Sequence, residues 1–297
     1  MYSLTVIIPN YNGKDLLQQY LPAVVSACTD SRTISDYEII IADDCSTDGS
    51  IDFIRRHYPE INLITSNHNN GFATNINQGI NKAGKQLVML LNNDIQISCE
   101  TIDKMIPLIG ADTFGVSCAI LDPQTHHIQE GRKIMTYSRH KIHSRDDMAP
   151  HTAAPTMYLC GGCAIIDRQK LLLLHGFDEI YSPFYFEDMD LGLRALQRGW
   201  QLLYTSQSAC LHQHSATINT QFSKQYVKQI FTRNRILLNY RFLPHTAILK
   251  IKIIFHTLQE TLNRKQYRPY TQALGIIRKH GITRQPLSQK LIEDLCK

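Results

Sequence analysis

The stretch LVMLLNNDIQI, residues 87–97, predicts the architecture of the chain. Its first five residues are apolar, which is typical of a strand buried on both faces of a sheet. Two amides and a carboxylate follow directly, at Asn92, Asn93 and Asp94. Open α/β sheets bind ligands beyond the carboxyl ends of their strands, and a carboxylate there can hold Mg²⁺ or Mn²⁺ on phosphate oxygens. Taken alone, this tripeptide is more typical of an ordinary turn.

Three earlier segments alternate with helical patterns in the same way. The expected strands cover residues 4–9, 37–42, 61–65 and 87–91, and the expected helices cover residues 14–28, about 49–58 and 72–83. This alternation predicts a largely parallel, doubly wound sheet. Residues 115–121 and 200–205 are expected to add strands. Residues 122–155, rich in His, Arg, Ser and Pro, indicate a long surface excursion.

Two common nucleotide-binding motifs are missing. A dinucleotide-binding domain would place G-x-G-x-x-G after the first strand, where this chain has Pro-Asn-Tyr-Asn-Gly at residues 9–13. A P-loop would need G-x-x-x-x-G-K-[ST], which does not occur. The pattern therefore argues against a Rossmann dehydrogenase and a P-loop NTPase.

Length and composition are those of a globular protein. The 297 residues can form one large α/β domain plus an appendage, and no apolar run approaches the ~18 residues of a membrane span. We expect no signal peptide, because no basic and apolar leader precedes the first strand. The eight cysteines have no disulfide-like spacing, so we expect reduced thiols in a cytoplasmic protein; a redox pair at Cys160 and Cys163 is the weaker alternative.

Positive charge is concentrated at the C-terminal end. Residues 1–221 carry 16 Lys and Arg against 23 Asp and Glu, whereas residues 222–297 carry 15 against 3. Such a basic segment suits an anionic membrane surface or nucleic acid, and nucleic acid is disfavoured because no base-reading motif is present. We predict a catalytic domain over residues 1–221 and a basic helical extension over residues 222–297.

Six ordered blocks carry a family resemblance. They read VIIPNYNG, EIIIADDCSTDGS, NNGFATNINQGINKA, LLNNDI, GGCAIIDRQ and FYFEDMDLGLRALQRGW. Together they resemble glycosyltransferase family 2, which has the GT-A fold, and within it the branch of bacterial rhamnosyl- and galactosyltransferases. The resemblance covers about residues 3–240. It implies inverting transfer of a sugar from a nucleotide-diphosphate donor, with a divalent metal, Mn²⁺ or Mg²⁺, on the diphosphate.

The resemblance also implies site residues. The nucleotide sugar would be bound by eight side chains near the strand ends: Pro9, Asn10, Asp43, Asp44, Asn75, Asn77, Asn92 and Asn93. Asp43 and Asp44 can also be read as a cap-and-turn pair, and Asn75 as a helix-surface residue.

Asp94 matches the last position of the D-x-D metal motif, whose first position is Asn92 here. One carboxylate fewer should weaken the site unless another ligand completes it. His212 is the favoured candidate and His214 the rival, and a histidine ligand favours Mn²⁺.

Residues 187–190 match the family's E-D-x-D block. An inverting displacement needs a carboxylate that takes the proton from the acceptor hydroxyl as the new bond forms. The resemblance assigns this general base to Asp188, and Glu187 would shape the acceptor site. Gly161 and Gly162 suit a close backbone approach near the acceptor. An acidic first turn without chemistry is the alternative reading.

The basic extension has a further pattern. Residues 246–262 place seven large apolar residues among lysines: Ile248, Leu249, Ile251, Ile253, Ile254, Phe255 and Leu258. Such a helix can lie in a membrane interface, next to lipid-linked acceptors, or pack on the catalytic domain or a second copy of the chain.

We therefore expect a metal-dependent glycosyltransferase on the cytoplasmic side of a bacterial membrane, acting in cell-surface glycan synthesis. Two other classes stay open: a sugar-phosphate nucleotidyltransferase, which would want a Gly-rich basic loop after the first strand, and a catalytically inactive binding or scaffolding protein.

Overall fold

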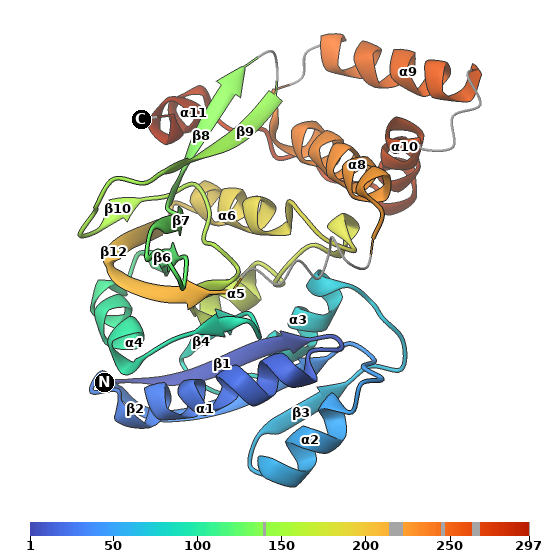
Figure 1. Ribbon diagram of the computed structural model, residues 1–297. Helices are drawn as coiled ribbons and strands as arrows, with labels where there is room; N and C mark the ends of the chain where they lie inside the picture. Colours follow the sequence, from blue (N-terminus) through green and yellow to red (C-terminus); the bar gives the residue numbers. More distant parts are fainter. Residues whose placement is uncertain (139–140, 214–221, 245–246, 263–267, 297) are drawn as a thin grey trace.

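The protein is described by a computed structural model that covers residues 1–138, 141–213, 222–244, 247–262 and 268–296. A large mixed sheet forms its centre (Figure 1), with the main strand order β10-β12-β6-β11-β4-β1-β2-β3. The strands of this order are β1 (Tyr2–Asn10), β2 (Ile34–Asp43), β3 (Asn62–Thr65), β4 (Leu87–Leu91), β6 (Thr113–Leu121), β10 (Ala154–Pro155), β11 (Cys163–Asp167) and β12 (Gln201–His212). β5 (Ile95–Gln96) pairs with β12, and β7 (Ile128–Glu130) pairs with β6.

Four of the seven neighbouring pairs in the main strand order run parallel. β1 pairs in parallel with β2 and β4, β2 with β3, and β6 with β12. β11 is antiparallel to both β4 and β6. The five residues of β4 are all buried, as the apolar run at 87–91 predicts, because helices cover both faces of the sheet.

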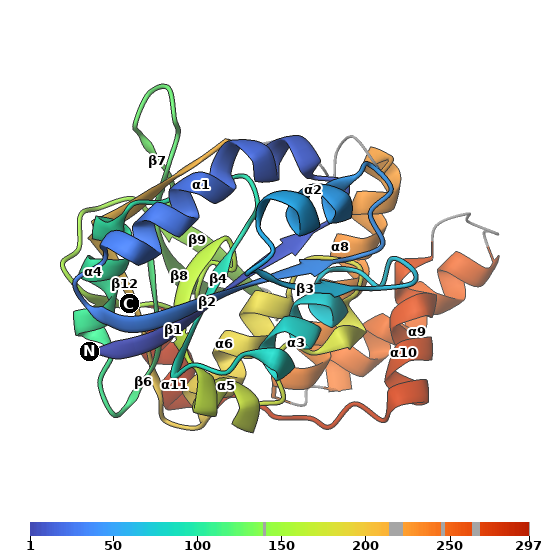
Figure 2. The same ribbon diagram turned by 90° about the horizontal axis from the view of Figure 1, so that it is seen from below.

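Two apolar layers enclose the sheet (Figure 2). One joins it to α1 (Lys14–Asp30), α2 (Ser50–His57) and α4 (Cys99–Met105), and the other to α3 (Phe72–Lys82), α5 (Arg168–Leu173) and α6 (Glu187–Gln197). Short 3-10 turns η1 (Ile106–Leu108) and η2 (Glu179–Tyr181) complete this part of the chain. The expected strand and helix alternation is confirmed.

The prediction of a surface excursion over residues 122–155 is wrong. This region contains β7 and β10 and a hairpin of β8 (Arg132–Ser138) and β9 (Lys141–Asp147). Met135 and Ile142 are buried in a third apolar cluster against the C-terminal helices. The partner of this hairpin lies about 100 residues further along the chain, so local polarity conceals its buried face.

The segment beyond residue 222 is helical, as expected: α8 (Lys224–Phe242), α9 (Ala247–Leu262), α10 (Pro269–His280) and α11 (Gln289–Leu295). α8 packs into the third cluster with Leu237 and Phe242 fully buried. Figure 1 shows α9 as the outermost of these helices, beyond α8 and α10 and away from the sheet.

Candidate active site

The carboxyl ends of β1, β2, β4 and β12 meet at one edge of the sheet. There the Asn10 amide donates to Asp43 (Nδ2 to Oδ2, 2.8 Å) and accepts from Asn93 (Nδ2 to Oδ1, 2.9 Å). Asp43 also accepts from the Ser46 backbone (2.8 Å). Three of the residues predicted to bind the nucleotide sugar therefore form one hydrogen-bonded row across three strand ends. Open α/β sheets bind ligands at this edge.

Other predicted donor residues border this row. Pro9 precedes Asn10 in β1, and Asp44 accepts from the backbone amides of Asn70 and Gly71, both at 2.9 Å. Asn75 is buried and donates to the Ala42 carbonyl (2.7 Å). Asp44 thus holds the loop that precedes α3, and Asn75 holds α3 itself, against the end of β2.

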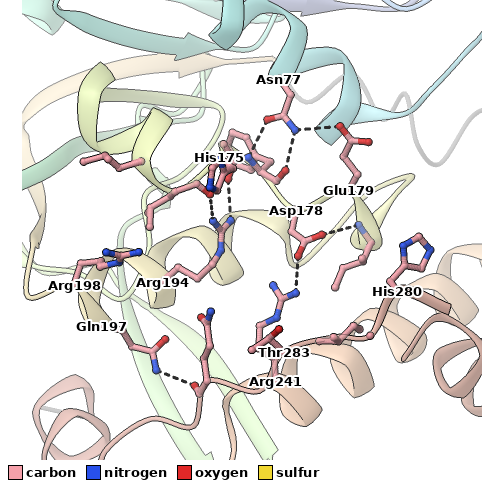
Figure 3. Close-up of a pocket in the computed structure, with 18 residues that line it drawn as sticks. Asn77, His175, Asp178, Glu179, Arg194, Gln197, Arg198, Arg241, His280 and Thr283 are labelled. Carbon is pink, nitrogen blue, oxygen red and sulfur yellow. Dashed lines mark hydrogen bonds and ion pairs between the residues drawn. The ribbon is translucent and has the colours of Figure 1, made fainter. Parts of the chain in front are cut away.

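Asn77 lies apart from these groups. Its amide accepts from the Phe177 backbone nitrogen (2.9 Å) and donates to the Phe177 carbonyl (2.8 Å), so we do not assign it to the donor site. It lines a cavity of about 840 Å³ (Figure 3). Arg194 and Arg241 in that cavity donate to carbonyls and carboxylates of the protein itself.

A carboxylate and an imidazole meet where β4 and β12 end. β5 pairs antiparallel with β12, opposing His212 to Ile95, and this register brings Asp94 Oδ1 to 3.2 Å from His212 Nε2. Both side chains are about nine-tenths buried. An oxygen and a nitrogen donor at this spacing fit a divalent cation such as Mn²⁺. His214, the rival ligand, lies outside the described residues.

The surroundings of this pair are acidic. Burial by itself would lower the pKa of His212, but the hydrogen bond and charge of Asp94, together with Glu130, raise it. Burial and the charge of Asp94 raise the pKa of Tyr20, whose hydroxyl donates to Gln213. Excess negative charge at a buried histidine and carboxylate favours a bound cation.

Asp188 and Glu187 open helix α6 on the other side of the Gly161–Gly162 turn. The Gly161 amide lies 3.4 Å from Asp188 Oδ2, and a Cβ at Gly161 would lie 2.7 Å from Asp188 Oδ1. On the other flank, the Gly162 carbonyl accepts from the Asn92 amide (2.9 Å). One two-residue turn therefore separates the predicted base from the strand end that carries Asp94.

The carboxyl groups of the E-D block have strongly shifted acidities. Burial raises the pKa of Asp188 to about 7, although the hydrogen bond from the Gly161 amide opposes this rise. The charge of Glu130 adds to the rise, and the charge of Lys133 reduces it. Burial and the charge of Asp188 raise the pKa of Glu187 well above its ordinary value. A carboxyl group that titrates near neutral pH suits a general base.

Sequence patterns missed two charged groups near this base. Lys133 of β8 is buried, and its Nζ lies 2.9 Å from Glu130 Oε2 and 2.7 Å from Asp146 Oδ1. Both Lys133 and Glu130 fall in the stretch expected to be a surface excursion. An isolated Lys and Glu in a polar segment give no signal, because their burial depends on the hairpin's distant partners.

Transfer should depend on pH through Asp188. At pH values below about 7 its carboxyl is protonated and cannot accept a proton, so we expect the rate to fall as pH drops through that value. Glu130→Gln removes a charge that raises this pKa and should move the acidic limb to lower pH. A pH profile of kcat/KM at saturating Mn²⁺ measures the limb, with the exposed Glu100→Gln as control. An unchanged limb in Glu130→Gln would contradict the assignment.

The backbone before Glu187 is strained. Tyr185 and Phe186 have φ values of 75° and 79°, a region that costs bulky residues about 1–3 kcal/mol each. The buried Asn234 of α8 donates to the carbonyls of Tyr181 (2.6 Å), Phe184 (2.9 Å) and Tyr185 (2.9 Å). Arg233 adds contacts to the same loop. These side chains of α8 therefore fix the position of the first turn of α6, which carries Glu187 and Asp188.

Asn234→Asp should slow transfer without removing donor binding. The substitution keeps the shape but loses the NH₂ donor to three carbonyls, and displacement of Asp188 by ~1 Å costs on the order of 100-fold in rate. Steady-state kinetics should show a fall in kcat, with little change in the KM for the nucleotide sugar. A variant with normal kcat, or one whose loss disappears after correction for its folded fraction, would contradict this positioning role.

A cavity of about 260 Å³ opens directly at the carboxylates. Its lining combines Glu187 and Asp188 with aromatic and basic side chains, among them Tyr158, Tyr185, Phe186, Phe231, His143 and Arg235. Glu187 Oε2 is buried and has no hydrogen-bond partner within the described part of the chain. The cavity is large enough for a sugar ring next to Asp188, with the amphipathic lining typical of small-molecule sites.

Comparison with known proteins identifies the family. The model of the Glycosyl transferase family 2 domain matches residues 5–172. The chain belongs to this family. This glycosyltransferase is 26% identical over 241 residues to an N-acetylglucosaminyl-diphospho-decaprenol L-rhamnosyltransferase of Mycobacterium tuberculosis, covering 70% of this chain and 75% of that protein. It is 22% identical to the O-antigen chain rhamnosyltransferase WbaN of Salmonella anatum, covering 78% and 72%.

Solved structures show the same fold. A mannosyltransferase from Pyrobaculum calidifontis, in complex with GDP-Man and Mn²⁺, aligns with a TM-score of 0.58 and 16% identity, covering 94% of this chain and 75% of that one. GalNAc-T7 with UDP, GalNAc and Mn²⁺ aligns with a TM-score of 0.65 and 14% identity, covering 96% and 55%. The expected family and the GT-A fold are thereby confirmed, and the two rhamnosyltransferases are consistent with the expected branch. In the described part of this glycosyltransferase, none of the helices could span a bilayer.

Proposed function

We propose that this glycosyltransferase moves a sugar, with inversion, from a nucleotide-diphosphate donor to a hydroxyl of a lipid-linked acceptor in bacterial cell-surface glycan synthesis. One observation carries the proposal: the Asp94–His212 pair and Asp188 flank the same Gly161–Gly162 turn at the ligand-binding edge of the sheet. The acceptors and donors named for the relatives and structural neighbours support the substrate classes.

The proposed reaction uses the two sides of the turn differently. Asp188 accepts the proton of the acceptor hydroxyl while the oxygen forms a bond to the sugar's anomeric carbon. The bond from that carbon to the diphosphate oxygen breaks, and the nucleoside diphosphate leaves with the electron pair. The row of Asn10, Asp43 and Asn93 would orient the nucleotide.

Asp94 and His212 would hold a divalent cation. Bound there, it would neutralise the negative charge that develops on the departing diphosphate. The imidazole favours Mn²⁺ over Mg²⁺, because Mg²⁺ prefers oxygen ligands. Thermal unfolding with nucleoside diphosphates tests the site: Mn²⁺ should enhance the rise in Tm caused by the nucleotide, and His212→Ala should remove that enhancement.

A panel of nucleotide sugars with Mn²⁺, with and without chelator, tests the activity itself. We expect transfer to a lipid-diphosphate sugar from one donor of the panel, a product of inverted anomeric configuration by NMR, and loss of transfer with chelator. Nucleotide binding without transfer to any acceptor would instead indicate an inactive binding protein. Retained configuration would contradict a single displacement.

We also propose that α9 docks the enzyme on an anionic bilayer, at the cytoplasmic face of the cell membrane. Five large apolar side chains are 56–73% exposed on α9: Ile251, Ile254, Phe255, Leu258 and Leu262. Their spacing places them on one helix face. The opposite face carries Ile253 and Glu260, both about 5% exposed, against the rest of the protein. With 15 basic against 3 acidic residues, the segment 222–297 has the charge that anionic lipids attract.

Vesicle flotation tests this surface. The full chain should float with vesicles containing phosphatidylglycerol and much less with pure phosphatidylcholine, and Ile254→Ser/Phe255→Ser should abolish flotation while leaving Tm unchanged. The exposed pair Leu173 and Met148 offers a control double substitution to Ser. A concentration-dependent dimer that the α9 variant disrupts, without flotation of the wild type, would assign the face to a second copy instead.

A further inference from the structure

The cavity at Asp188 has two basic side chains that the proposed chemistry does not use. Arg235 of α8 and His143 of β9 line it together with the two carboxylates. Sugar transfer by Asp188 requires an acceptor hydroxyl and a donor carbon, and neither needs a guanidinium or an imidazole in the acceptor cavity. These side chains therefore need an explanation of their own.

Arg235 is held next to the cavity by an aromatic ring and not by an acid. Its guanidinium lies 5.5 Å from the centroid of Phe231, and the Phe231 ring lies 4.9 Å from Phe186, which precedes Glu187. Within the ranges that the structure describes, Arg235 forms no ion pair with a carboxylate. Burial and the nearby positive charges of Arg235 and Lys141 lower the pKa of His143, so its imidazole can serve a ligand as a hydrogen-bond donor and not as a second cation. A fixed guanidinium without a carboxylate partner is a suitable phosphate receptor.

Arg235 also lies on the way from the cavity to α9. Burial raises the pKa of Tyr270, at the start of α10, and the charge of Arg235 opposes this rise. The Tyr270 ring lies 4.6 Å from the His256 ring of α9. Glu260 of α9 accepts from the backbone amides of Tyr270 (3.2 Å) and Thr271 (2.9 Å), which fixes α9 against the start of α10. α8, which carries Arg235, packs against α10, and α10 packs against α9, the helix with the exposed apolar face.

We infer that Arg235, assisted by His143, binds a phosphate group of the acceptor, between the sugar at Asp188 and the lipid chain at α9. The inference rests on the proposed function and adds to it the side chains that recognise the diphosphate between the acceptor sugar and its lipid. The succession from the cavity through α8 and α10 to α9 matches the order of groups along such a molecule. Aromatic rings would contact the sugar, the guanidinium the phosphate, and the apolar face of α9 the membrane in which the lipid is embedded.

Three acceptors with the same sugar separate the contribution of the diphosphate from that of the lipid chain: a long-chain prenyl diphosphate, a short-chain alkyl diphosphate and an uncharged alkyl glycoside. Arg235→Gln should raise KM for both diphosphate acceptors on the order of 10- to 100-fold and leave KM for the glycoside and kcat unchanged. Arg235→Lys should recover part of the loss, because it keeps the charge without the fork of donors. The exposed Arg278→Gln is the matched control and should change none of these values.

If Arg235→Gln raises KM equally for the diphosphate acceptors and the glycoside, Arg235 only supports the cavity wall and the inference fails. An unchanged KM for both diphosphate acceptors would also overturn the inference. A loss confined to the long-chain acceptor would assign Arg235 to the membrane surface. Calorimetric binding of the short-chain alkyl diphosphate, with donor nucleotide and Mn²⁺ present, tests the same contact without catalysis. Binding by the wild type but not by Arg235→Gln supports the inference even if no transfer is found, and equal binding by both refutes it.

Discussion

Asp188→Asn should lower the rate of sugar transfer by about 10²- to 10⁴-fold, the usual contribution of a general base. The substitution replaces one carboxylate oxygen by an amide that cannot accept the acceptor proton. It keeps the size of the side chain and its fit against Gly161, where a Cβ would lie only 2.7 Å from Asp188 Oδ1. Single-turnover transfer with saturating donor and Mn²⁺ measures the effect on the chemical step.

The exposed Asp52→Asn serves as the control for this variant, because Asp52 lies in the first turn of α2. It should transfer at the wild-type rate. Glu187→Gln should be less damaging to kcat than Asp188→Asn and should act mainly on the KM for the acceptor. If Asp188→Asn transfers at the wild-type rate while Glu187→Gln does not, the base is Glu187 and our assignment fails.

Asp190→Asn should destabilise the fold by about 3–5 kcal/mol, the loss expected when one partner of a buried ion pair is removed. Asp190 is fully buried and accepts from Tyr181 (3.0 Å), Arg194 (2.6 Å) and Arg241 (2.5 Å). Arg241 also binds Asp178 (2.6 Å). Without the Asp190 carboxylate, two guanidinium groups lose their shared counter-charge at the contact of α6 with α8. Urea unfolding followed by circular dichroism measures the change.

The exposed pair Lys104–Glu100 in α4 supplies the comparison. Its atoms are also close (2.7 Å), but the side chains are 46% and 73% exposed. Glu100→Gln should therefore change the free energy of unfolding by less than about 1 kcal/mol. Similar losses in Asp190→Asn and Glu100→Gln would show that burial does not govern the strength of these pairs. A stable Asp190→Asn protein with normal transfer would remove the proposed link between α8 and the active site.

Much of the fold could be predicted because its signals are local. The apolar run at 87–91 appears as β4 with its predicted bounds, and it ends at the residues that meet Asn10 and His212. Parallel strands bring their carboxyl ends to one edge whatever their separation in the sequence, so Asn10, Asp43 and Asp94 could be grouped in advance. The family resemblance then supplied His212 and Asp188, which strand periodicity alone does not connect.

The remaining features depend on distant partners. The β8–β9 hairpin is polar on one face and buries Met135 and Ile142 only because α8 and α11 are present. Nothing in the sequence signals the burial of Lys133 and Asp190, although both are buried in ion-pair networks. Asn77 shares a helix with Asn75 but faces Phe177, a segment 100 residues away. The sequence does not distinguish an α9 that lies in a membrane interface from one that packs on the domain or on a second copy. Its exposed apolar face is defined only by the burial of Ile253 and Glu260 on the opposite face.

The most direct test of the account is calorimetric titration of the best nucleoside diphosphate, with Mn²⁺, into Asp94→Asn and Asp188→Asn. We predict that Asp188→Asn binds the nucleotide as the wild type does. Asp94→Asn should lose at least about tenfold in Mn²⁺-dependent affinity, the lower part of the range expected when a metal site is damaged. Equal loss of binding in both variants, or wild-type binding by Asp94→Asn, would contradict the division of roles between the two sides of the Gly161–Gly162 turn.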